Sequence, residues 1–283
     1  PDGFICREIR ADGSDCFERY DPTSTGPNLL PWVELTYYRQ FGDIDRLHKV
    51  FPALCAYAKW WRLNRTWPDG TYWSSGWGTG MDNMPRVKPE YNPIFSHGHM
   101  VWLDTNLQQM LVDESLLNIG FYIERWQEIE DMEDEMKRLR AYVNEHLWDE
   151  RTAFLYDRYG DGTLCTTKGI GAFWALQADA LDRERLDRMG AHLSDTTEFD
   201  RPHRVPSLSA DHPKYNPLGR YWQGGVWPGT NYMTIDGLYR KGYHDLAREI
   251  AANHYAAVFE VWKNTGTFWE YYAPEKIEPG FMA

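Results

Sequence analysis

Apolar residues recur at helical spacing in paired stretches along the chain. The first pair covers residues 28–40 and 43–63, with Gly42 between them. Apolar side chains three and four positions apart are typical of helices that bury one face. A glycine after the first stretch and Asp43 at the start of the second are residue types that end and begin helices. The pattern therefore predicts a helical hairpin.

The same pairing returns three more times. The further pairs are 100–120 with 123–147, 167–180 with 182–193, and 226–239 with 243–262. Two of these pairs turn at or near a glycine, Gly120 and Gly242. The first stretch of a pair tends to be apolar on most sides and the second to have one apolar face, as an inner and an outer ring of helices would require. We therefore expect an all-α fold with four hairpins.

Long connectors separate the predicted hairpins. They cover residues 64–99, 148–166 and 194–225 and are rich in Gly, Pro, Trp and Asn. Connectors longer than about 15 residues are unusual in a compact domain unless they carry function. The arrangement favours an α/α toroid with its functional loops on one face. Strands are expected to be minor, at residues 4–9 and 154–156.

Charge and composition narrow the class of partner. Among 283 residues, 42 are acidic and 30 are basic, a formal net charge of −12. This balance argues against nucleic acid or an anionic membrane as the partner. Aromatic residues make up 16% of the chain, and their flat faces suit sugars. We expect a small carbohydrate as the partner. The oligomeric state stays open, and the localisation too, with a slight preference for the cytoplasm.

No cofactor or metal ion is expected. His97 and His99 are the closest approach to a metal-binding pattern, and they are too isolated in the sequence to form a good site.

The first segment with candidate chemistry is residues 72–86. Its candidate site residues are Trp77, Asp82, Asn83 and Arg86. Asp82 has apolar neighbours in the sequence, and such surroundings raise the pKa of a carboxyl, as a general acid requires. The alternative is a turn aspartate that binds its own backbone.

Two later segments combine aromatic and polar residues. Residues 220–228 include Tyr221, Trp222, Gln223 and Trp227, and residues 267–272 include Trp269, Glu270 and Tyr272. Indole faces can stack on a sugar, and a glutamine amide can bridge two hydroxyls. A carboxylate on a rigid, mostly dry wall can deprotonate a water. Structural packing by the tryptophans, and a loop glutamate paired with an arginine, are the alternatives.

Together, residues 80–86, 221–228 and 269–272 resemble three blocks of glycoside hydrolase family 63 and the related trehalases. Residues 3–30 are similar to a segment of the mannosylglycerate hydrolase-like branch. The resemblance implies a toroid of six α-hairpins and inverting hydrolysis of α-glycosides. It assigns Asp82 as the general acid and Glu270 as the general base. The aromatic and polar residues of the three blocks would then contact the sugar.

The chain departs from that family in its number of helices, because the toroid has twelve and the pattern predicts eight. We therefore expect an incomplete toroid, a single catalytic domain over residues 1–283 that is truncated at both ends. Candidate substrates are glucosylglycerate, mannosylglycerate, short α-gluco-oligosaccharides and trehalose. A glycerate group would need a cation, for which Arg7, Arg86 and Arg220 are candidates. The alternatives are a trehalase-like enzyme, a catalytically inactive carbohydrate-binding relative and a terpene-cyclase-like protein.

Overall fold

The computed structural model describes residues 2–282, and its contacts divide the chain into two compact units. Unit 1 comprises Pro1–Asp82, Lys88–His146 and Arg158–Thr163, and unit 2 comprises Asn83–Val87, Leu147–Asp157 and Leu164–Ala283. The chain therefore passes from one unit to the other at the peptide bond between Asp82 and Asn83. This bond lies inside the first candidate block.

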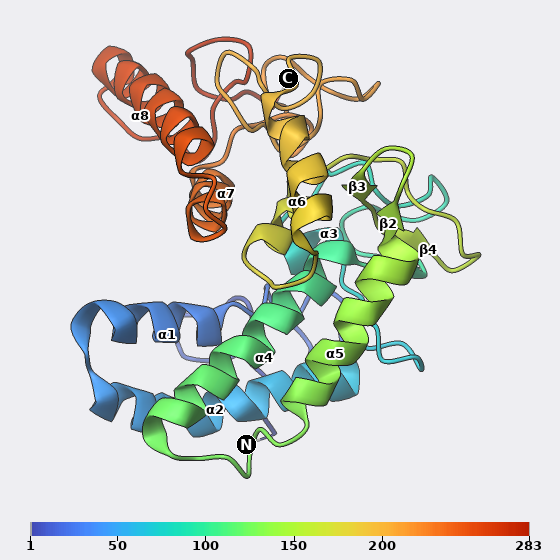
Figure 1. The fold of residues 1–283 in the computed structure, drawn as a ribbon, viewed down its shortest axis with the longest axis vertical. Coiled ribbons are helices and arrows are strands. Elements are labelled where there is room, and N and C mark those ends of the chain that lie inside the picture. Colours follow the sequence, from blue (N-terminus) through green and yellow to red (C-terminus); the bar gives the residue numbers. More distant parts are fainter. Residues whose placement is uncertain (1, 283) are drawn as a thin grey trace. The chain divides into compact units, whose positions relative to one another are not determined.

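Unit 1 is built around one buried helix. Its elements are α1 (Leu30–Phe41), α2 (Ile44–Asn64), α3 (Gly76–Thr79), β1 (Met100–Val101), α4 (Leu103–Ile123), α5 (Met132–Tyr142) and β4 (Arg158–Tyr159). Most residues of α4 are buried, and α4 packs against α1, α2 and α5 (Figure 1). Leu35, Phe51 and Leu116, one from each of α1, α2 and α4, lie in one apolar cluster. β1 pairs antiparallel with β4.

Unit 2 combines short elements with one long hairpin. Its elements are β2 (Trp148–Asp149), β3 (Phe154–Leu155), the 3-10 helix η2 (Ile170–Leu176), α6 (Arg183–Gly190), the 3-10 helix η3 (Ala191–Ser194), α7 (Pro228–Arg240) and α8 (His244–Thr265). β2 pairs antiparallel with β3. α7 and α8 lie side by side (Figure 1), and η2 packs against α7. The rings of Phe154, Phe173 and Phe199 pack together in the core. A short π-helix, η1 (Val143–Leu147), follows α5 at the boundary between the units.

The structure confirms the first predicted hairpin. The carboxylate of Asp43 accepts a hydrogen bond from the backbone N–H of Arg46 and so caps α2. Gly42 ends α1 in the left-handed conformation, with φ of 71°. α4, α7 and α8 also form within a few residues of the predicted bounds. Asp182 caps α6, where the second helix of the third pair is expected.

The predicted helix over residues 123–147 is wrong in its first third. α4 continues to Ile123, Glu124 ends it with φ of 56°, and α5 begins at Met132. Gly120 lies inside α4 rather than at the turn. A Cβ atom on Gly120 would overlap Cδ1 of Ile129 and lie only 2.7 Å from the backbone oxygen of Arg125. Glycine is therefore needed there because the chain returns close to the helix, not because it ends it.

Two further expectations differ from the structure. The helix expected over residues 167–180 is shorter and of another type, because only Ile170–Leu176 are helical and they form the 3-10 helix η2. Residues 4–9 form no strand and contribute one isolated bridge, between Ile9 and Asp15. The strand expected at 154–156 is confirmed as β3. β1, β2 and β4 are not predicted, because two-residue strands are too short to show an alternating pattern.

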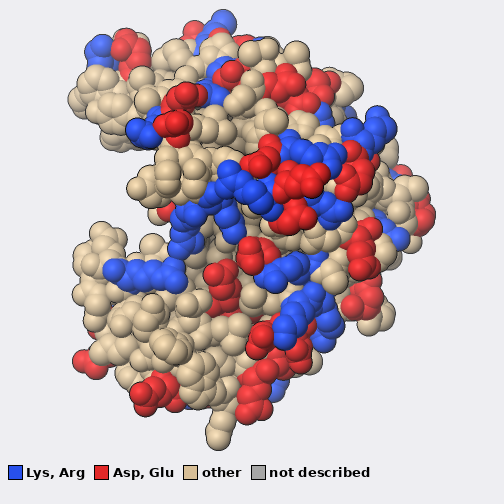
Figure 2. All heavy atoms as spheres, viewed as in Figure 1, with Lys and Arg blue, Asp and Glu red and all other residues tan. Residues whose placement is uncertain are grey.

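Charges of both signs are mixed on the surface over α5 and α6 (Figure 2). Lys137 pairs with Glu133, and Arg185 and Arg188 pair with Glu150. Among the described residues, no helix has the length and apolar character needed to cross a membrane.

Candidate functional site

Asp82 lies in unit 1, just after the one-turn helix α3. Ser75 caps this helix by accepting a hydrogen bond from the backbone N–H of Gly78, and Gly80 ends it with φ of 73°. The indole Nε1 of Trp77 then donates a hydrogen bond of 2.9 Å to Oδ2 of Asp82. Burial raises the pKa of Asp82 above its ordinary value, whereas the indole N–H and the charge of Arg7 act to lower it. A raised pKa suits a general acid.

The indole of Trp77 is held by its own neighbours in unit 1. The guanidinium of Arg7 lies 5.2 Å from the ring centroid and donates a hydrogen bond to the backbone oxygen of Trp77. Phe17 and Phe95 contact the indole edge-on, at 5.8 Å and 5.3 Å between ring centroids. These contacts restrict the indole, and the hydrogen bond in turn orients the carboxyl of Asp82.

Asn83 lies in unit 2, where its side chain bridges a strained turn. Its Nδ2 donates to the backbone oxygen of Arg220 at 2.9 Å, and its Oδ1 accepts from the backbone N–H of Trp222 at 2.8 Å. Arg220 and Tyr221 have φ of 35° and 65°. Non-glycine residues in this region cost roughly 1–3 kcal/mol each and persist only where the surroundings hold them. The amide of Gln223 donates to the backbone oxygen of Asn83, at 3.2 Å.

Arg86 is buried in unit 2 and bound to an acid that the sequence analysis did not select. Its Nε and Nη2 donate to Oδ2 and Oδ1 of Asp157 at 2.8 Å and 2.5 Å. The side chains are 6% and 8% exposed. Nothing in the spacing of the sequence links these residues, which are 71 positions apart. The guanidinium is therefore committed to a protein carboxylate.

Three stacked rings join the second and third candidate blocks. Trp227 stacks on Trp222 with 4.0 Å between centroids and 4° between planes, and on Tyr271 with 4.9 Å and 19°. Tyr221 contacts Trp227 edge-on at 4.8 Å. The three stacked side chains are buried, and both faces of the Trp227 indole are covered. We call Trp222, Trp227 and Tyr271 the ring stack.

Glu270 lies beside this stack and is exposed to solvent. Backbone hydrogen bonds of 2.9 Å in both directions between Val226 and Tyr272 hold the third block against the second. Burial raises the pKa of the Tyr271 hydroxyl, and the charge of Glu270 raises it further. Within residues 2–282, Glu270 has no hydrogen-bond or ion-pair partner. Its carboxylate is thus available to a water or a ligand.

Trp269 and Tyr272 line an apolar groove of unit 2. The groove has a volume of about 660 Å³ and lies along α7 and α8. Its other lining residues are Pro228, Ile235, Ala251, His254, Tyr255, Val258, Phe259, Trp262 and Phe268. Of these two site candidates, Trp269 presents exposed aromatic surface to the groove, whereas Tyr272 is buried at its base.

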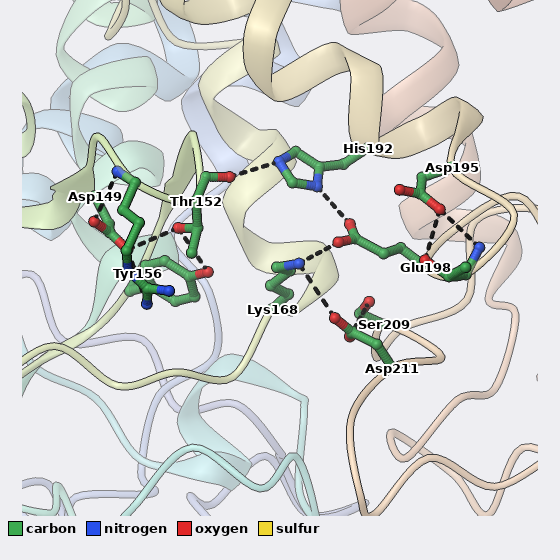
Figure 3. Close-up of polar contacts among 11 residues, drawn as sticks. Asp149, Thr152, Tyr156, Lys168, His192, Asp195, Glu198, Ser209 and Asp211 are labelled. Atoms are coloured by element: carbon green, nitrogen blue, oxygen red, sulfur yellow. Dashed lines mark hydrogen bonds and ion pairs between the residues drawn. The ribbon is translucent and has the colours of Figure 1, made fainter.

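A charged network elsewhere in unit 2 carries no residue that the sequence analysis selected (Figure 3). Glu198 is buried and receives Nζ of Lys168 on one oxygen and Nδ1 of His192 on the other. Lys168 also contacts Asp211 at 3.3 Å. Because the charges in this network satisfy one another, its role is to hold loops of unit 2 together.

Apart from Arg86, which binds Asp157, the site candidates thus fall into two groups. Trp77 and Asp82 are in contact within unit 1, and Asn83, Tyr221, Trp222, Gln223 and Trp227 form one connected group in unit 2 with the third block beside it. Tyr271 and Asp157 are the members that the sequence analysis missed. Among the described residues, no group of three or more His, Cys, Asp or Glu could hold a metal ion.

Known proteins resemble this chain in sequence to different extents. Residues 14–279 match the family described as the mannosylglycerate hydrolase MGH1-like glycoside hydrolase domain. An uncharacterized protein of Borreliella burgdorferi is 25% identical over 260 residues, which cover 90% of this chain and 52% of that protein. A mannosylglycerate hydrolase of Rubrobacter radiotolerans is 31% identical over 140 residues, 47% of this chain and 29% of that enzyme. The chain thus spans about half the length of the first relative and less of the second.

A solved structure extends the comparison to the fold. The mannosylglycerate hydrolase of family 63 from Thermus thermophilus, solved in complex with glucose, superposes with a TM-score of 0.81 at 21% identity. The match covers 99% of this chain and 80% of that one. At this identity the likeness shows the fold, which is the all-α, α/α toroid class expected from the sequence. Because the family match covers residues 14–279, this chain belongs to the family of mannosylglycerate hydrolase MGH1-like glycoside hydrolase domains.

Proposed function

We propose that this protein hydrolyses small α-linked glucosides or mannosides with inversion at the anomeric carbon. Asp82 is the general acid and gives its proton to the glycosidic oxygen. Glu270 is the general base and takes a proton from the water that attacks the opposite face of the sugar. The observation that carries the proposal is the half-buried carboxyl of Asp82, whose pKa is raised and whose orientation depends on the Trp77 indole. An inverting pair works with its carboxyls roughly 6.5–9.5 Å apart.

Some of the remaining site candidates are proposed to contact the sugar, and the others hold those residues in place. Gln223 uses one N–H on Asn83, so its second N–H and its oxygen are left for sugar hydroxyls. Trp269 offers exposed aromatic surface and Tyr221 a phenol beside the ring stack. Tyr272 is buried and supports Trp269 from below, since its hydroxyl accepts a hydrogen bond from the backbone N–H of Trp269 at 3.2 Å. Trp222 and Trp227 support these residues through the stack, because the faces of Trp227 are already covered.

The aglycone is proposed to carry a carboxylate, as glycerate does. Relatives named mannosylglycerate hydrolase support this class. Of the three arginines considered, Arg86 is bound to Asp157, whereas Arg7 is exposed and lies over the Trp77 ring that binds Asp82. Because Arg7 lies beside the indole that binds the proposed acid, it is the arginine that we assign to the carboxylate of the leaving group. Arg7→Gln should raise KM for a glycerate glycoside while leaving KM for trehalose unchanged. Equal effects on both substrates would contradict this role.

A proton NMR time course tests the reaction itself. The panel contains glucosylglycerate, mannosylglycerate, short α-gluco-oligosaccharides and trehalose. We expect one member to disappear with the β-anomer of the sugar appearing first. The α-anomer first would indicate retention. Sugar binding by calorimetry without turnover of any member would favour the catalytically inactive relative.

Two variants test the roles of the carboxyls. Asp82→Asn should lower kcat on a glycoside by about 10²–10⁴-fold, the usual contribution of one acid or base. Glu270→Gln should lower kcat to a similar extent and leave sugar binding intact. Wild-type rates in both variants would contradict the assignment.

A further inference from the structure

We infer that the buried Arg86–Asp157 ion pair positions the general acid rather than contacting the sugar. This inference rests on the proposed function, because it takes Asp82 as the acid. Arg86 is three residues after Asn83 in the segment Asn83–Val87, which belongs to unit 2. Asp82 is joined to that segment by one peptide bond. Whatever holds the segment therefore limits where the backbone of Asp82 can lie.

Several hydrogen bonds fix the segment to unit 2, one of them from the Gln223 amide to the backbone oxygen of Asn83. The Arg86 guanidinium binds both oxygens of Asp157. The hydroxyl of Thr167 donates to the backbone oxygen of Pro85 at 2.7 Å, and Sγ of Cys165 donates to the backbone oxygen of Arg86 at 3.3 Å. The Asn83 side chain also binds the backbone of residues 220 and 222. A five-residue segment with this many attachments has little freedom to shift.

A buried ion pair is a poor way to gain stability, because removing two charges from water offsets most of their attraction. Well-packed apolar residues of similar volume often stabilise as much or more. The bidentate pair instead fixes orientation, since the planar guanidinium and the carboxylate each hold the other in one geometry. This geometry suits a group that must hold a neighbouring residue within a fraction of an ångström.

A positioning role and a sugar-contact role differ in which substrates they affect. A glycoside with an alkoxide leaving group needs the proton of Asp82, whereas a glycosyl fluoride releases a stable anion with little help from an acid. Misplacement of a catalytic group by about 1 Å can cost on the order of 10²-fold. A fault in the position of Asp82 should therefore slow the glycoside and spare the fluoride.

The test compares the α-glycosyl fluoride with the glycoside that the wild type hydrolyses. The first variant, Arg86→Lys, keeps the positive charge but cannot form the bidentate hydrogen bonds of a guanidinium. The second is the double variant Arg86→Met with Asp157→Leu, which replaces the ion pair by apolar side chains. We expect kcat on the glycoside to fall about 10- to 100-fold in both. On the fluoride, kcat should stay within about threefold of wild type, KM should change little, and the double variant should unfold near the wild-type temperature.

The matched control is Glu198→Gln. It breaks a buried ionic network in the same unit (Figure 3) without removing a partner of residues 83–87. Its ratio of glycoside to fluoride rates should equal that of the wild type.

Other outcomes overturn the inference. A higher KM on both substrates would mean that Arg86 binds the sugar. Equal losses on both substrates together with a lower unfolding temperature would mean that the pair serves the fold alone. Failure of the proposed function has a different signature, because Asp82→Asn would then keep the wild-type rate on the glycoside.

Discussion

The ring stack makes a sharp prediction about how the second and third blocks depend on each other. Trp227→Leu keeps apolar volume but removes two stacked contacts, one with Trp222 and one with Tyr271. Such a contact contributes about 0.5–1.5 kcal/mol beyond area burial, so the two together are worth roughly 1–3 kcal/mol. The free energy of unfolding should fall by at least this amount, because the smaller side chain also leaves unfilled space in a buried site.

A double-mutant cycle isolates the contact with Tyr271. Urea unfolding of the wild type, Trp227→Leu, Tyr271→Leu and the double variant should give a coupling free energy of about 0.5–1.5 kcal/mol. The control cycle replaces Tyr271 with Trp148, which is equally buried in unit 2 and packs on Arg185 and Arg188. That cycle should be additive within about 0.5 kcal/mol. A Trp227–Tyr271 coupling no larger than the control would refute the claim that the stack joins the two blocks.

The stack also has a consequence for catalysis. Tyr271 directly follows Glu270 in the chain, so a ring that shifts carries the proposed base with it. Trp227→Leu should lower kcat on the preferred glycoside by about tenfold or more, although Trp227 has no open face for a sugar. An unchanged kcat together with a raised KM would instead indicate that this indole contacts the substrate.

Three further predictions concern single positions. Trp77→Phe removes the N–H that favours the ionised form of Asp82, so the pKa of Asp82 should rise further and the basic limb of the kcat/KM profile should move to higher pH; a shift to lower pH would contradict the role of the indole. Gly120→Ala should destabilise the protein by about 1–3 kcal/mol in thermal or urea unfolding, because its methyl group would meet a backbone oxygen at 2.7 Å. Gly190→Ala, in α6 with nothing within 4 Å of the added carbon, should stabilise by up to about 1 kcal/mol; effects of the same sign at both glycines would refute the packing argument.

Helix positions could be predicted because they depend on local periodicity and on capping residues. Asp43 and Gly42 carry their signals within three residues of the helix ends that they make. The failed predictions have causes that lie outside the local sequence. Gly120 is the residue type of a turn, yet its reason is the approach of Ile129 from outside the helix, which no window of sequence around Gly120 reveals. The 3-10 helix Ile170–Leu176 packs against α7, where Gly237 lets Leu176 come close.

In the candidate site too, contacts between residues close in the sequence could be predicted and contacts between distant residues could not. Asp82 and Trp77 could be related from the sequence because they are only five positions apart, and a one-turn helix brings them together. Asp157 could not be found, since its only relation to Arg86 is spatial across 71 positions. The same holds for Tyr271, whose stacking on Trp227 needs the backbone bonds between Val226 and Tyr272. Residues that can carry out chemistry can be identified in the sequence by their type. The residues that hold them in place can be identified only from contacts in the structure.

The contacts in the structure change the interpretation of the first candidate block, residues 80–86. Asp82, Asn83 and Arg86 look like one pocket-lining motif in the sequence, yet the side chain of Asn83 holds a strained turn and that of Arg86 holds a buried carboxylate. Of these three residues, Asp82 alone has a carboxyl, and burial disfavours its charged form. An acid must be both reactive and precisely placed, and these demands conflict within one side chain, because each strong contact that would fix the carboxyl also lowers its pKa. Placing the strong contacts on residues 83 and 86 meets the second demand without giving up the first.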